Sequence, residues 1–228
     1  MSNWIYLKSS LPEDALALSA VISNSDRHYN VVRQSCFTSL LYGHPNIDIY
    51  GIPLESDDVK ILSINSNNTF EEKCQSLSEQ LSVTGSDYVP FIPKRDELGG
   101  IKSLIDNSNV LIVLEHPKED LLVDVLLIDK IVHGLSEKGY KSIQTSDFTL
   151  PHIRGTYDLR GSDALQLLLH IDSLKCIVSN SPFWQLIAKF MNKVFYKTDD
   201  INNSLPENRD DINANIAINI ISKSLQHG

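Results

Sequence analysis

Residues 4–22 constrain the fold of this chain more than any other stretch. Residues 4–7 are mostly apolar and typical of a buried strand, and Lys8 and a short polar loop follow them. An apolar-periodic segment that opens near Asp14 then predicts a helix. A strand, a tight turn and a helix N-terminus form the cradle in which α/β proteins hold an anionic or sugar ligand. We therefore expect part of any chemistry here.

Strands and helices alternate along the rest of the chain. The continuous apolar run at 110–114 is of the kind that is buried on both faces of a parallel sheet. Further strands are predicted at 29–32, 47–52, 60–64, 141–145, 176–179 and 194–196, and helices at 35–42, 70–81, 119–138, 182–191 and 211–225. Ser162 is predicted to cap one more helix, and a stripe of Ile212, Ile216 and Ile220, widened by Ala217 and Ile221, marks the last one. This alternation predicts an α/β fold with parallel sheets and right-handed crossovers.

A connector divides the predicted fold into two halves. Residues 84–100 are rich in glycine and proline, which marks a linker or hinge. We therefore predict one half over residues 1–100 and a second over 101–228. Ligands of such sheets lie beyond the carboxyl ends of the strands. This rule directs attention to the loops at 8–14, 115–118, 146–161 and 179–183.

Charge and cysteine content narrow the function and the compartment. The formal net charge of −9 over 228 residues argues against a non-specific nucleic-acid binder, which usually carries a basic stripe, but leaves room for a local basic pocket. Three widely spaced cysteines indicate reduced thiols, and no Cys-x-x-Cys or His-Glu-x-x-His motif suggests a metal site. The N-terminus shows no signal-peptide pattern, and no apolar run approaches the about 20 residues of a membrane span. We expect a cytoplasmic protein.

The loop after the first strand holds the first candidate cluster: Lys8, Ser9, Ser10, Glu13 and Asp14. Asp14, at a helix start, is a candidate general base that deprotonates an acceptor hydroxyl. Lys8, Ser9 and Ser10 are candidate substrate-binding residues. The alternative is that Asp14 or Glu13 only stabilises the helix N-terminus, by about 0.3–1 kcal/mol. On spacing alone, this alternative is favoured.

Candidates for a donor phosphate lie in the second half. Lys118, after the strand at 110–114, is a candidate diphosphate ligand with His116 beside it, and a solvated loop is the alternative. Ser179, Asn180 and Ser181 follow a strand and precede a helix, where hydroxyl, amide and free N–H groups suit a phosphate. Ordinary helix capping is the alternative there, and it does not exclude phosphate binding.

Arg160 is the remaining basic candidate in these loops. It is a candidate ligand of a phosphate or a base. A salt bridge with Asp158 or Asp163 is the plainer interpretation of the same pattern. The sequence is compatible with both interpretations.

Two stretches together are similar to a known family. The first is Ile5-Tyr-Leu-Lys-Ser-Ser…Asp14-Ala-Leu, continued by Leu41-Tyr-Gly-His-Pro-Asn-Ile-Asp, and the second is Asp158-Leu-Arg-Gly-Ser…Cys176-Ile-Val-Ser-Asn-Ser. They resemble the bacterial ADP-heptose:lipopolysaccharide heptosyltransferase-like glycosyltransferases. The resemblance touches both cores and is weak between them. It implies a compact GT-B fold: two Rossmann-like halves with parallel sheets facing a cleft, donor binding by the C-terminal half, and a last helix that crosses back to the first half.

Position by position, the resemblance implies roles for individual residues. Asp14 matches the catalytic base, Lys8 the basic residue that ends the first strand, and Lys118 approximately a phosphate-binding lysine. Residues 179–181 match the donor-phosphate loop. The implied activity is an inverting, metal-independent transfer of a sugar from a nucleotide-sugar donor to a glycan or other hydroxyl acceptor, without a cofactor.

Departures from the family pattern leave two other functions open. Glu13 stands where the family has glycine, and Pro182-Phe183-Trp184 replaces the segment with the donor-side histidine. One alternative is a non-catalytic module that binds a nucleotide, a glycan or a partner enzyme. The other is a phage-type enzyme that glycosylates DNA bases, against which the negative charge counts unless basic residues cluster at the cleft.

Overall fold

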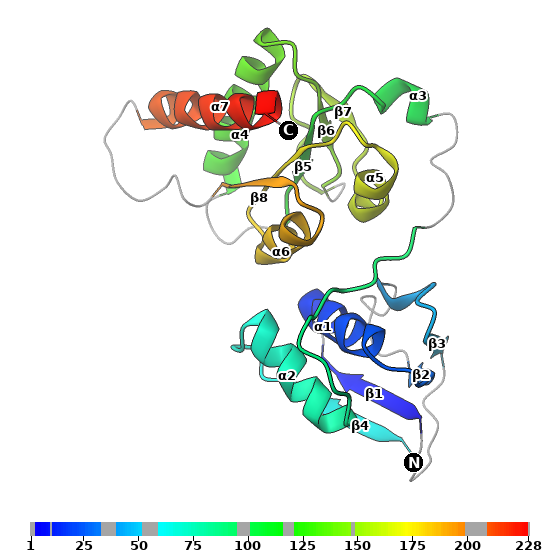
Figure 1. Cartoon of the computed structure of the whole chain (residues 1–228). Helices are drawn as coiled ribbons and strands as arrows, with labels where there is room; N and C mark the ends of the chain where they lie inside the picture. The colour runs from blue at the N-terminus through cyan, green and yellow to red at the C-terminus, as the bar shows by residue number, and fades with distance from the viewer. Residues whose placement is uncertain are drawn as a thin grey trace. The chain divides into compact units, whose positions relative to one another are not determined.

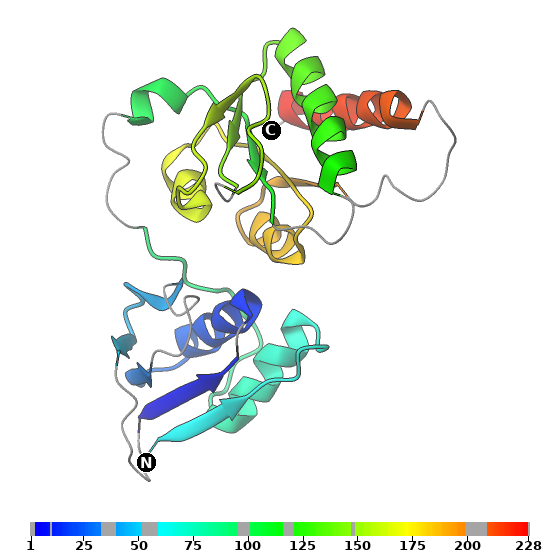
Figure 2. The same cartoon turned by 180° about the vertical axis from the view of Figure 1, so that it is seen from behind.

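The computed structural model describes residues 3–9, 11–32, 40–51, 59–94, 101–115, 121–146, 149–198 and 209–227, with the backbone alone at 121–124, 209–213 and 227. The chain divides into two compact units, Met1–Arg95 and Asp96–Gly228. Each unit has its own parallel sheet and its own hydrophobic core. Figures 1 and 2 show the two units from opposite sides.

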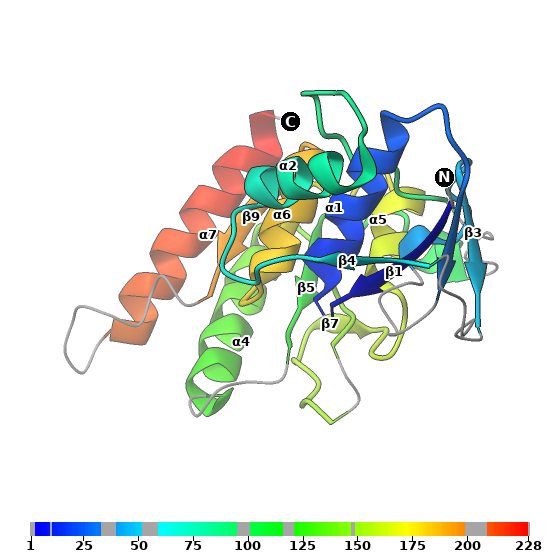
Figure 3. The same cartoon turned by 90° about the horizontal axis from the view of Figure 1, so that it is seen from below.

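The first unit is built on a four-stranded parallel sheet in the order β3-β2-β1-β4. Its elements are β1 (Trp4–Lys8), α1 (Pro12–Ser23), β2 (Tyr29–Val32), β3 (Ile47–Tyr50), β4 (Lys60–Ser63) and α2 (Phe70–Leu81). Both helices lie on the same face of the sheet, as Figures 1 and 3 show. The four predicted strands and the helix at 70–81 are confirmed, and most of the helix predicted at 35–42 lies outside the described residues.

Alternation on β1 explains how this sheet meets its helices. Ile5 and Leu7 are buried in one cluster with Leu18 of α1 and Leu77 of α2, because every second residue of a strand points to the same face. Thr69 starts α2 with a capping box. Its side chain accepts a hydrogen bond from the backbone N–H of Glu72, and its own N–H donates to the Glu72 carboxylate.

The outer edge of β4 is bound by a side chain of α2. Gln80 Nε2 donates to the carbonyl oxygen of Ser63 (3.0 Å), and Gln80 Oε1 accepts from the N–H of the same residue (3.2 Å). Lys60 Nζ also donates to the backbone oxygen of Gln80. The strand therefore has β1 on one side and the amide of Gln80 on the other.

The second unit carries a five-stranded parallel sheet in the order β7-β6-β5-β8-β9. Its strands are β5 (Val110–Val113), β6 (Ser142–Gln144), β7 (Thr156–Asp158), β8 (Cys176–Ser179) and β9 (Val194–Lys197), and its helices are α3 (Lys102–Ile105), α4 (Leu121–Glu137), α5 (Ala164–His170), α6 (Pro182–Phe190) and α7 (Arg209–His227). Two of these elements, α3 and β7, were not expected, because four and three residues are too few to show a hydrophobic period.

Helices cover both faces of this sheet, which is why its central strands are fully buried. All four residues of β5 and all four of β8 are buried. Helices α4 and α7 pack together on one face, and α5 and α6 lie on the other (Figures 1 and 2). A side chain at Gly134 of α4 would overlap Ile218 of α7, so the glycine permits the close approach of these two helices.

Two sequence expectations for the second unit are wrong in detail. The side chain of Asp163, not Ser162, caps α5, because it accepts hydrogen bonds from the N–H groups of Leu165 and Gln166. The buried face of α7 consists of Ala214, Ala217, Ile218 and Ile221. Of the predicted stripe, Ala217 and Ile221 are buried as expected, but Ile216 and Ile220 are exposed. The side chain of Ile212 lies outside the described residues.

A buried histidine joins three segments of the first unit. His44 Nδ1 accepts a hydrogen bond from the N–H of Asn46 (3.1 Å), so its Nε2 carries the proton and donates to the carbonyl oxygen of Ser19 in α1 (3.3 Å). The ring also meets the edge of Phe91 at a centroid distance of 5.2 Å. Burial lowers the pKa of His44 below 6.5, the Ser19 carbonyl opposes this shift, and His28 adds to it.

We predict that His44 makes the first unit less stable in acid. The native state favours the neutral ring, so the unfolded state binds more protons once the pH falls below the ordinary pKa of 6.5. The free energy of unfolding, measured by urea denaturation, should fall as the pH decreases from 7 through the lowered pKa of His44. His44→Asn keeps an acceptor for Asn46 and should flatten this dependence, whereas replacing the exposed His133 should leave it unchanged. An unchanged pH profile in His44→Asn would refute the assignment.

Candidate functional site

The carboxyl end of β1 brings together most of the first predicted cluster. Lys8, the last residue of β1, is exposed and lies beside Ser63 of β4. Helix α1 begins at Pro12, so Asp14 lies in its first turn rather than at its start. Ser10 is outside the described residues.

Asp14 is buried and has a protein partner at each carboxylate oxygen. Its exposed fraction is 1%, and that of Lys73 in the first turn of α2 is 4%. Lys73 Nζ lies 2.7 Å from Asp14 Oδ1, and the hydroxyl of Ser9 donates to Oδ2. Ser9 Oγ in turn accepts from the N–H of Leu11 (3.0 Å). The aspartate therefore joins α1 to α2 through an ion pair nearly excluded from water.

Lys73 is a functional candidate that sequence reasoning did not identify. Its signal is its place on the buried face of α2, four residues before Leu77 and eight before Leu81. A lysine in an apolar stripe is almost never fully buried without a partner. The carboxylate that balances it, however, belongs to another helix and is distant in the sequence.

The second candidate region lies where the strand order of the second sheet changes direction. The chain adds β6 and β7 on one side of β5, and β8 and β9 on the other. Beyond this point Asn180 Oδ1 accepts from the N–H of Glu115 (3.2 Å), and Nδ2 donates to the oxygen of the same residue (3.4 Å). Ser179 Oγ accepts from the N–H of Ser181 (3.1 Å). The residues predicted at 179–181 therefore lie at the switch point, where ligands of open α/β sheets bind.

Helix α6 begins directly after this loop. Ser181 makes no side-chain capping bond, and Pro182 occupies the first helical turn without an N–H. Lys118 and His116, predicted for the neighbouring loop, are outside the described residues.

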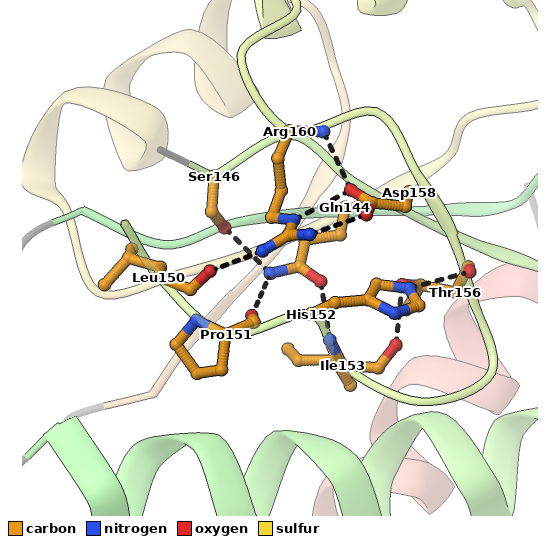
Figure 4. A network of polar contacts seen from close by, with 9 residues as sticks. All are labelled: Gln144, Ser146, Leu150, Pro151, His152, Ile153, Thr156, Asp158 and Arg160. Atoms are coloured by element: carbon orange, nitrogen blue, oxygen red, sulfur yellow. Dashed lines mark hydrogen bonds and ion pairs between the residues drawn. The ribbon is translucent and has the colours of Figure 1, made fainter. Parts of the chain in front are cut away.

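Arg160 forms a salt bridge with Asp158 (Figure 4). This contact was the plainer of the two interpretations of its sequence pattern. Its Nε and Nη2 donate to the two carboxylate oxygens of Asp158 at 2.9 and 2.7 Å, and Nη1 donates to the oxygen of Leu150 at 2.7 Å. The Arg160 side chain lowers the pKa of Asp158 to about 2. The guanidinium therefore binds the β7–α5 loop to the segment near residue 150.

Gln144 belongs to the same network (Figure 4). Its role, like that of Lys73, is not apparent from the sequence. Fully buried in β6, it donates to the oxygen of Pro151 (2.8 Å) and accepts from the N–H of Ile153 (2.7 Å). Ser146 Oγ accepts from the N–H of Leu114 (3.1 Å). These bonds fix the loops that surround the carboxyl ends of β5 and β6.

Several other kinds of site find no support in the part of the chain that the structure describes. It contains no group of three or more His, Cys, Asp or Glu side chains that could hold a metal ion. Burial raises the pKa of Cys74 and of Cys176 to about 12, so neither thiol is a ready nucleophile. None of the described helices combines the length and apolarity needed to cross a membrane.

Two solved structures that resemble this chain in fold are structures of a glycosyltransferase. The chain matches the iron-containing dodecameric glycosyltransferase TibC from enterotoxigenic E. coli H10407 at a TM-score of 0.54 and 12% identity, over 98% of this chain and 76% of that one. A structure of TibC as a heptosyltransferase in complex with ADP-D-β-D-heptose matches at a TM-score of 0.56 and 12% identity, over 97% and 76%. No family model and no curated protein matches the sequence.

The fold is thus a compact, GT-B-like α/β fold with two parallel sheets, as predicted. At 12% identity the likeness is one of fold, and it is distant.

We predict that Lys73→Met destabilises the first unit strongly. Removing one partner of a buried ion pair leaves Asp14 charged and uncompensated, which costs about 3–5 kcal/mol of the free energy of unfolding. Urea denaturation measures this loss. The double variant Asp14→Leu, Lys73→Met should recover most of it, because apolar side chains often replace a buried pair without loss.

The exposed pair of His28 and Asp48, 2.9 Å apart, provides the matched control. Asp48→Asn should cost less than about 1 kcal/mol. Equal losses in Lys73→Met and Asp48→Asn would contradict the importance of burial at Asp14.

Proposed function

We propose that the protein is a glycosyltransferase that moves a sugar from a nucleotide-sugar donor to an acceptor hydroxyl, with inversion at the anomeric carbon. The observation that supports it is the fold likeness to TibC, a glycosyltransferase, over 97–98% of this chain. Polar clusters at the carboxyl ends of β1 and β8, where ligands of such sheets bind, add to it. We also propose that the protein is cytoplasmic.

Asp14 is the proposed general base. Its carboxylate would accept the proton of the acceptor hydroxyl while the acceptor oxygen attacks the anomeric carbon and the bond to the diphosphate breaks. The contacts made by Ser9 and Lys73 add a requirement to this step. Because Asp14 is only 1% exposed, Ser9 or Lys73 must move before the acceptor hydroxyl can reach the carboxylate. Lys8, exposed at the end of β1, would bind substrate beside it.

The leaving diphosphate would be stabilised in the second unit. The TibC structure with ADP-D-β-D-heptose suggests a nucleotide-sugar as donor. The loop at 179–181 and the start of α6 would supply N–H groups and a positive dipole end, and Lys118 a positive charge. Arg160 contributes least to this proposal, because Asp158 and Leu150 already take three of its five N–H groups. No step is assigned to a metal or a cofactor.

A second candidate function is a non-catalytic module that binds a nucleotide or a glycan on the same scaffold. Specific contacts favour it: Asp14, Arg160 and Asn180 each bond to another part of the protein in the described structure. Residues with such contacts stabilise the fold of the protein itself. Both candidate functions include ligand binding, but only the glycosyltransferase turns over a sugar donor.

Calorimetry with ADP, GDP and UDP, followed by nucleotide release from the matching sugar donors, tests the proposal. We expect one nucleotide to bind and its sugar donor to be turned over. Asp14→Asn should lower turnover by about 10²–10⁴-fold, the usual contribution of a general base, and leave nucleotide affinity nearly unchanged.

The double variant Asp14→Leu, Lys73→Met is the control for folding, because it removes the carboxylate without leaving a buried lysine unpaired. Full turnover in either variant would remove Asp14 from the mechanism. Binding without turnover on a broad panel of donors and acceptors would favour the module.

A further inference from the structure

A polar pocket lies along β3, the outer strand of the first sheet. It has a volume of about 540 Å³ and is lined by residues 42–44, from the turn before β3, and 47–50, the strand itself. Small-molecule sites in proteins have volumes of about 300–1,000 Å³ and combine aromatic walls with a few polar groups. All of its lining residues belong to the first unit.

Two exposed tyrosines form walls of this pocket. Tyr42 is 43% exposed and Tyr50 is 42% exposed, and both line it. The ring centroids of Trp4 and Tyr50 lie 4.8 Å apart, and the two ring planes are inclined at 51°. This contact holds the Tyr50 ring in place, so a ligand loses little by ordering it. The faces of such rings carry partial negative charge and attract the C–H groups of a flat, hydroxyl-rich ring.

Asp48 supplies a carboxylate to the lining of the pocket. Its side chain is more than half exposed, and His28 Nε2 lies 2.9 Å from its Oδ2. Carboxylate oxygens are acceptors for hydroxyl groups, and a bond to an ionised acceptor is shorter and stronger than a neutral one. Among the residues that the structure describes, no lysine or arginine lines the pocket, and the chain carries a net charge of −9, so an anionic ligand is disfavoured.

We propose that this pocket binds a sugar ring of a neutral carbohydrate, stacked on Tyr42 or Tyr50 and hydrogen-bonded by Asp48. A cation would also meet aromatic faces and a carboxylate, so an organic cation is the competing ligand that the experiment must distinguish. The proposal goes beyond sugar transfer and does not rest on it, because Asp14 and the loop at 179–181 do not line the pocket.

Saturation-transfer NMR on the whole chain tests the proposal, with the methyl glycosides of glucose, galactose, mannose and N-acetylglucosamine as probes. At about 10 mM probe, a site of millimolar affinity is occupied. We expect transfer to the ring C–H protons of at least one glycoside. Tyr42→Ala or Tyr50→Ala, whichever removes the stacked ring, should weaken its affinity by up to about tenfold. Asp48→Asn should also weaken it.

Tyr157→Ala is the matched control, because Tyr157 is 38% exposed but belongs to β7 of the second unit. Its glycoside signals should equal those of the wild type. No transfer to any glycoside would overturn the proposal, and so would binding that survives each of Tyr42→Ala, Tyr50→Ala and Asp48→Asn. Transfer to tetramethylammonium but to no glycoside would also overturn it, and would identify a cation site.

Discussion

The ion pair of Asp14 and Lys73 is the interaction on which the first unit most depends. Charges this deeply buried repay the loss of their hydration only with close geometry and additional hydrogen bonds, and the Ser9 hydroxyl supplies one. The pair fixes the start of α1 against the start of α2, and through Ser9 it also fixes the loop that leaves β1. The same arrangement compensates the charge of the carboxylate that transfer chemistry would use. Under the proposed mechanism, the structural and catalytic demands on Asp14 would compete, and the substrate would have to supply the free energy that displaces Ser9 or Lys73.

The second unit shapes the corresponding edge of its sheet with neutral groups. The amides of Asn180 and Gln144 bond to backbone N–H and C=O groups of neighbouring segments, so no buried charge is needed. Arg160 and Asp158 form a charged pair, but Asp158 is partly exposed to water. Amides that satisfy both a donor and an acceptor fix loop geometry with little electrostatic cost. A bound anion would therefore meet oriented dipoles at this edge.

Local patterns in the sequence predict most of the fold. The apolar runs of β5 and β8, and the Thr69–Glu72 capping box, are signals contained in a few adjacent residues. Short elements without a period, such as β7, escape this reasoning. The predicted stripe of α7 is right only in part, because Ala214 and Ile218 pack on its buried face and Ile216 and Ile220 do not. The sites are harder still. Asp14 and the loop at 179–181 can be found from their places after strands, whereas their partners Lys73 and Glu115 are set by tertiary structure.

The side chain of Gln80 has a consequence for how this protein behaves among its own copies. Its amide bonds to the N–H and the C=O of Ser63 in the way that a residue of an adjacent strand would. An unprotected edge strand is a template on which another chain can add a strand and begin a fibril. Here a glutamine from the unit's own helix occupies that position, and the ammonium group of Lys60 lies nearby. At Ser63, the open edge of β4 is therefore not available to a strand of another chain.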